Sequence, residues 1–216
     1  MCYTYIINLF EGIVMKKILA LVLLSSLVWG SWGTEVTFKG EQVILNSKGL
    51  KVGDMAPVFI TVNKDFMEVT VGGAKDKVQV IAFVPSFDTG TCKLETIAFN
   101  EKVSKMKNVE VIVVSKDLPF AISRFCHDNK IKNINTVSDY KDANYALRYG
   151  TTISSPPYLE GFFARVVYIV NTDGEITYKE VVREISEEPN YDRIINAVNS
   201  LTKYDNIKEG VKALKK

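Results

Sequence analysis

The sequence has few of the residues that build metal sites and disulfide scaffolds, with three cysteines and one histidine among 216 residues. No CxxC, HxH or HExxH spacing occurs, so no metal-ligand set is evident. Only 13 glycines and 6 prolines are present, which excludes a collagen-like or low-complexity chain. The 27 basic and 25 acidic residues give a net charge of +2, too little to attract nucleic acid. We therefore expect neither a bound metal ion nor a nucleic-acid partner.

The composition that remains is that of a globular protein. Hydrophobic residues make up 47% of the chain and charged residues 24%, which excludes intrinsic disorder. The length suffices for one sizeable domain and is short for two.

Residues 1–33 have the order of a secretory signal peptide. Met15 is followed by two lysines and by an uncharged apolar run over residues 18–30, shorter than the ~20 residues that a membrane span needs. The small residues Ser31 and Gly33 occupy the positions −3 and −1 from the expected cleavage site. We expect translation from Met15 and export to the periplasm, without stable membrane insertion after cleavage. An uncleaved anchor and a cytoplasmic protein with a misassigned start are the alternatives.

Residues 34–201 are predicted to form one α/β domain, and residues 202–216 a lysine-rich extension. The expected strands are residues 34–38, 42–45, 57–62, 67–71, 78–84, 109–114, 133–137, 164–170 and 175–182. The expected helices are residues 89–106, a segment beginning at Asp117, residues 142–149, and a last helix beginning near Pro189-Asn190. The first two strands form a short hairpin, and the continuous apolar run at 78–84 predicts a central strand. This alternation implies a central sheet with helices on both faces.

The helix after Asp117 carries the first of two cysteine positions of interest. Asp117 is expected to cap its N-terminus. Apolar residues recur at the helical spacing of one buried face, at positions Leu118, Ala121, Ile122 and Phe125. Cys126 falls on the same stripe, which by itself predicts a packed structural thiol. His127 is expected to be a surface residue at the helix end.

Cys92 lies in the first turn of a helix that directly follows the predicted central strand. Unpaired N–H groups and the helix dipole favour an anion there, and a thiolate is such an anion. At the ordinary thiol pKa of about 8.5, only about 3% of a thiol is ionised at pH 7, and a helix terminus contributes only about 0.3–1 kcal/mol. A reactive thiol would therefore need a nearby cation. The position is equally compatible with a small buried side chain.

Four separated blocks resemble one known family. Residues 85–92, PSFDTGTC, resemble the signature of the thiol peroxidases, the atypical 2-Cys peroxiredoxins. Residues 115–126, 161–165 and 184–191 are similar to three further blocks of that family, in the same order. The resemblance covers about residues 36–201 and implies a thioredoxin-like fold, peroxide reduction and a homodimer.

The resemblance also implies roles for individual residues. Cys92 would be the peroxidatic cysteine and Cys126 the resolving one, joined in a redox disulfide, with Thr89 and Arg165 completing the site. The guanidinium of Arg165 would stabilise the thiolate and the developing charge on the peroxide, and the Thr89 hydroxyl would bond to both sulfur and peroxide. A thioredoxin-type donor would reduce the disulfide. No metal, haem or flavin cofactor is required.

Two supporting residues have alternatives that stay open. Pro85 would shield the thiolate from water, or it simply ends the strand, and Arg124 is either a second cation near the site or a surface ion-pair residue.

The aromatic pair Phe162-Phe163, close to Arg165, favours alkyl or lipid hydroperoxides over hydrogen peroxide.

The distance between the two cysteines sets the last expectation. A disulfide needs Cα atoms within about 7 Å, which two buried cysteines in separate helices do not satisfy, so both helix ends should unravel in each cycle.

Two other functions remain open, namely an exported binding domain with one structural disulfide and a general thiol–disulfide oxidoreductase. The second is disfavoured because the thiols of Cys92 and Cys126 do not form a CxxC.

Overall fold

The structure is a computed structural model that describes residues 35–141 and 147–213. The predicted leader lies outside the described residues, and so does most of the helix expected at 142–149. Within the part described, no helix has the length and apolar character needed to cross a membrane.

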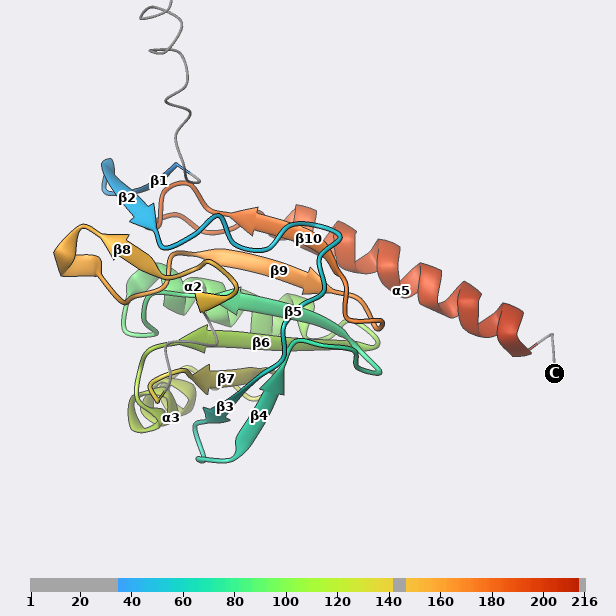
Figure 1. Ribbon diagram of the computed structural model, residues 1–216. Helices are drawn as coiled ribbons and strands as arrows, with labels where there is room; N and C mark the ends of the chain where they lie inside the picture. Colours follow the sequence, from blue (N-terminus) through green and yellow to red (C-terminus); the bar gives the residue numbers. More distant parts are fainter. Residues whose placement is uncertain (1–34, 142–146, 214–216) are drawn as a thin grey trace, which may run out of the picture. The chain divides into compact units, whose positions relative to one another are not determined.

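A seven-stranded mixed sheet forms the centre of the domain (Figure 1). Its strands, in spatial order, are β10 (Ile176–Val181), β9 (Val166–Val170), β5 (Val78–Phe83), β6 (Val109–Ser115), β7 (Asn135–Ser138), β3 (Phe59–Asn63) and β4 (Glu68–Val71). The strands β5, β6 and β7 run parallel, and the other pairs are antiparallel. Every residue of β5 is buried, which confirms that this apolar run is a central strand.

A second, three-stranded sheet consists of β1 (Val36–Phe38), β2 (Glu41–Leu45) and β8 (Ile153–Ser155). The hairpin of β1 and β2 is the one expected from the sequence. Strand β8 is not among the expected strands, because three residues are too few to show an alternating pattern. A short 3-10 helix, η2 (Pro157–Leu159), follows it.

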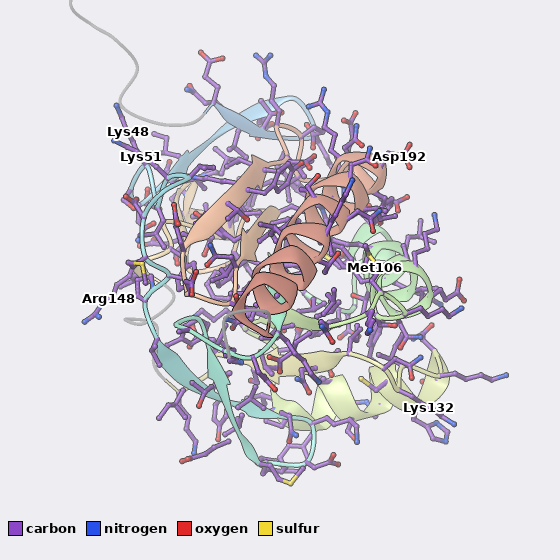
Figure 2. All side chains as sticks on the ribbon, turned by 90° about the vertical axis from the view of Figure 1, so that its right-hand side faces the viewer. Lys48, Lys51, Met106, Lys132, Arg148 and Asp192 are labelled. Atoms are coloured by element: carbon purple, nitrogen blue, oxygen red, sulfur yellow. The ribbon has the colours of Figure 1, made fainter. Side chains whose placement is uncertain are left out.

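Side chains of the central strands alternate between two cores. Val80 and Ala82 point into the core that also contains residues of α2 (Gly90–Ala98), α3 (Pro119–Asp128) and α5 (Tyr191–Ala213). Ile81 and Phe83 point into the other core, which is covered by residues of β1, β2 and β8. In Figure 2 Met106 and Lys132 lie on the right of the view and Lys51 and Arg148 on the left.

Two of the described helices, α2 and α3, differ from expectation. The helix expected at 89–106 ends as α2 at Ala98 and continues as one turn of π-helix, η1 (Phe99–Val103). Helix α5 begins at Tyr191, where the last helix was expected, and extends through most of residues 202–216. The expectation that Asp117 caps α3 is wrong: Pro119 takes the first helical position, so Leu118 becomes the N-cap and Asp117 lies outside the helix. Leu118 is also 53% exposed, so it does not belong to the buried face of α3.

Candidate active site

Cys92 lies in the first turn of α2, directly after the turn that follows β5. Its side chain is fully buried. Thr89 is the N-cap residue of α2, and its hydroxyl oxygen accepts a hydrogen bond from the backbone N–H of Cys92 at 3.4 Å. The same hydroxyl donates to the carbonyl of Ser86 at 3.2 Å. The Thr89 hydroxyl therefore shapes the backbone around the thiol, and its bonds to the sulfur and to a peroxide stay predictions.

Arg165 supplies the cation that the sequence argument required. It precedes β9 and is 1% exposed, and its Nη2 lies 3.5 Å from the Sγ of Cys92. Its Nε and Nη2 both donate to the carbonyl of Ile185, at 3.0 and 2.9 Å. These two bonds fix the plane of the guanidinium and so its approach to the sulfur.

Glu95 is a member of the site that sequence reasoning missed. The Nη1 of Arg165 donates to Oε2 of Glu95, while Oε1 has no hydrogen-bond partner in the part of the chain described. Burial raises the pKa of Glu95 to about 7, although Arg165 acts in the opposite direction. Burial disfavours the charge of Arg165 as well, but Glu95 and Cys92 outweigh it and raise the pKa of that guanidinium. The available signal was an acidic residue three positions after Cys92, on the same helix face.

A cavity of about 460 Å³ opens beside these residues. Pro85, Thr89 and Arg165 line it, so three of the predicted residues face one space. Most of the remaining wall is apolar, formed by Phe38, Ile153, Leu159, Phe162 and Ile185. Of the predicted aromatic pair only Phe162 faces the cavity, because Phe163 is fully buried with its ring 5.3 Å from that of Phe83. The arrangement suits a small polar group carried on an apolar body.

Cys126 lies near the end of α3 and is 3% exposed. Its Sγ is 3.1 Å from the hydroxyl oxygen of Thr136 on β7, and burial raises the pKa of the Cys126 thiol. Cys92 and Cys126 are both free thiols, in separate helices that border the same core. His127 is exposed, as the sequence predicts.

Arg124, the other predicted cation, lies on the exposed side of α3. It lines a depression of about 260 Å³ together with Thr89 and Phe125. The structure therefore brings Arg165, and not Arg124, against the buried Cys92 thiol.

The mixed sheet flanked by helices is a thioredoxin-like fold, and it carries a buried thiol at a helix N-terminus beside an arginine. Residues 51–195 match the redoxin family. The chain is 47% identical over 166 residues to the thiol peroxidase of Aquifex aeolicus, covering 77% of this chain and 97% of that protein. It is 41% identical to a thiol peroxidase of Leptospira interrogans over 77% of this chain and 98% of that protein.

The solved structures agree. A peroxiredoxin-like protein from Aquifex aeolicus superimposes with a TM-score of 0.74 at 47% identity, covering 77% of this chain and 96% of that one. The chain therefore belongs to the redoxin family, and within it to the peroxiredoxins, which are oxidoreductases.

Proposed function

We propose that the chain is a thiol peroxidase that serves in antioxidant defence, with Cys92 as the reacting group. The observation that carries this proposal is the guanidinium of Arg165, 3.5 Å from the Cys92 sulfur at the edge of the apolar cavity. The thiolate attacks one peroxide oxygen, the O–O bond breaks, and the other oxygen leaves as water or an alcohol. Arg165 stabilises the negative charge on sulfur and on the departing oxygen, and Pro85 limits the access of water.

The second step is resolution by Cys126. Its thiol condenses with the sulfenic acid of Cys92, so the S–O bond breaks, an S–S bond forms and water leaves. Both cysteines are buried in separate helices, so the ends of α2 and α3 open for this step. A thioredoxin-type dithiol then reduces the disulfide by exchange, and no bound cofactor takes part.

The preferred substrates are organic hydroperoxides with an apolar body. The wall formed by Phe38, Leu159 and Phe162 gains from burying such a body, and hydrogen peroxide offers nothing to bury. A higher second-order rate for cumene hydroperoxide than for hydrogen peroxide supports this preference. A clear preference for hydrogen peroxide contradicts it.

The assembly we propose is a homodimer. Leu118 and Phe120 at the start of α3 are 53% and 65% exposed, and the ring of Phe120 stacks edge-on to Phe66, which is 48% exposed. Apolar side chains that gather on one surface favour burial in an interface. Phe120→Glu is expected to convert the dimer to a monomer in analytical ultracentrifugation.

The proposed compartment is the periplasm. Residues 16–33 carry the order of an export signal, and the disulfide then needs a thioredoxin-like donor outside the cytoplasm, because the periplasm is kept oxidising. Mass spectrometry of the native N-terminus after cell fractionation tests this. A periplasmic chain that begins near residue 34 supports export, and an intact leader in the cytoplasmic fraction contradicts it.

A stopped-flow assay tests the peroxidase proposal itself. Reduced protein is mixed with sub-stoichiometric peroxide, and the loss of thiol is followed. Cys92→Ser is expected to abolish the reaction, and Arg165→Met to slow it by about 100-fold or more, the usual cost of one lost donor to a developing anion. Arg193→Met, an exposed arginine on α5, is the matched control. Peroxide consumption no faster than by free cysteine contradicts the proposal.

A further inference from the structure

Asp117 connects the two segments that carry the thiols. It stands between β6 and α3, and its carboxylate accepts two hydrogen bonds from the turn that precedes α2. Oδ1 accepts from the hydroxyl of Ser86 at 2.8 Å, and Oδ2 from the backbone N–H of Phe87 at 2.7 Å. We call residues 85–89 the peroxidatic turn. The carboxylate thus ties the peroxidatic turn to the chain that begins α3.

A second contact ties the same turn to the other end of α3. The side chain of Phe87 is 2% exposed, and its ring centroid lies 5.0 Å from that of Phe125. Phe125 directly precedes Cys126. The peroxidatic turn is therefore held at two points, by the carboxylate of Asp117 just before α3 and by the ring of Phe125 beside Cys126.

The carboxylate end of this connection is fixed in place. The backbone N–H of Asp117 donates to the hydroxyl of Ser115 at 3.1 Å, and its carbonyl accepts from the hydroxyl of Ser138. Ser115 and Ser138 belong to β6 and β7, two paired strands of the central sheet. When the two segments separate, the peroxidatic turn is therefore the part that moves.

We propose that Asp117 is a positioning residue that latches the peroxidatic turn onto the segment that leads from β6 into α3, and thereby limits how fast oxidised Cys92 reaches Cys126. The inference rests on the proposed function, because it assumes resolution by a Cys92–Cys126 disulfide. While the latch is closed, Cys92 stays beside Arg165, where it meets peroxide. When the latch opens, the turn and the start of α2 are free to approach Cys126.

The latch sets the ratio of two reactions of the sulfenic acid. With Cys126 it forms a disulfide and water. With a second hydroperoxide molecule the sulfenic acid forms sulfinic acid: the O–O bond breaks, one oxygen is transferred to sulfur, and the other leaves in the alcohol. Opening the latch more often favours the first reaction, because the second needs the closed arrangement. A protein without the latch should therefore resolve faster and be overoxidised less.

Rapid-quench mass spectrometry of the full chain measures both products. A Cys2→Ser background leaves Cys92 and Cys126 as the only cysteines. For Asp117→Ala we expect disulfide formation about tenfold faster, equivalent to about 1.4 kcal/mol, and a proportionally smaller sulfinic fraction in each turnover. The rate of sulfenic acid formation should change less than twofold. Asp76→Asn, exposed at the opposite end of β5, is the matched control and should change neither product.

Milder variants keep the test decisive if Asp117→Ala loses the peroxide reaction by misfolding. Asp117→Asn and Ser86→Ala each weaken the same contact and should accelerate resolution by a smaller factor, and their effects should not add in the double variant. Unchanged or slower resolution in these variants, with the peroxide step intact, overturns the latch. If the unsubstituted protein forms no Cys92–Cys126 disulfide at all, the proposed resolving step fails instead, and that result is separate.

Discussion

Replacing Glu95 by glutamine should remove a pH dependence from the stability of the protein. Glu95 is fully buried, and its pKa is raised from the ordinary value of 4.5 to about 7. The folded state then holds a proton that the unfolded chain has already released above pH 4.5. The contribution of this carboxyl to the free energy of unfolding is fully present below pH 4.5, and it is lost as the pH rises to about 7. Glutamine keeps the shape and the acceptor for Arg165, but it does not titrate.

The size of the effect follows from the two pKa values. Between 4.5 and about 7, at about 1.36 kcal/mol for each pH unit, the carboxyl loses about 3 kcal/mol of stability. A typical domain has only about 5–15 kcal/mol in total, so the loss is measurable. Above pH 7 the curve should flatten, because Glu95 is then ionised in both states and paired with Arg165.

Urea denaturation between pH 4.5 and 8 measures this loss in the full chain. The free energy of unfolding of the unsubstituted protein, minus that of Glu95→Gln, should fall by about 3 kcal/mol from pH 4.5 to 7. Glu101→Gln, an exposed glutamate of η1, is the matched control and should leave the pH profile unchanged. A difference that stays within about 1 kcal/mol over this range would refute the reasoning.

Substitutions at three further positions test the site and its surroundings. Desolvation raises the pKa of Glu184, but hydrogen bonds from Ser186 and from the β1–β2 hairpin outweigh it and lower this pKa to about 2. Glu184→Gln should therefore be less stable than the parent at pH 7. Thermal unfolding should show the gap closing as the pH falls from about 4.5 to about 2, and a gap independent of pH contradicts this. Phe162→Ala should lower the rate with cumene hydroperoxide about tenfold and leave hydrogen peroxide unaffected; equal losses with both peroxides argue against an apolar substrate site. Thr89→Val should lower the free energy of unfolding by about 1 kcal/mol and slow the peroxide step, and Thr89→Ser should restore both; a variant as stable as the parent removes Thr89 as a cap.

Much of the fold follows from local patterns in the sequence. The apolar run that became β5 is long, buried on both faces and ended by Pro85, so its position and central place were predictable. The three residues of β8 gain their hydrogen bonds from β2, more than a hundred residues away, and carry no pattern of their own. Asp117 shows the same limit, because its carboxylate binds a turn 30 residues earlier in the chain.

Some residues of the site were likewise predictable from the sequence, and others were not. The family resemblance located Cys92, Thr89 and Arg165, and the need for a cation beside the thiol followed from the small contribution of a helix terminus. Glu95 was missed although it lies three positions after Cys92, because an acidic residue at that spacing does not by itself indicate burial against Arg165. The carbonyl of Ile185 was missed because a backbone acceptor 20 residues from Arg165 leaves no pattern in the sequence.

The contacts of Arg165 also constrain when the site exists during synthesis. The guanidinium joins Cys92, 73 residues earlier, to the carbonyl of Ile185, 20 residues later. Glu184, next to Ile185, accepts a hydrogen bond from Thr37, 147 residues before it. Because a ribosome releases the chain from its N-terminus, these partners meet only after nearly the whole domain has emerged. Until then Cys92 lacks its contact with Arg165, so a nascent or unfolded chain in transit has only an ordinary thiol at this position.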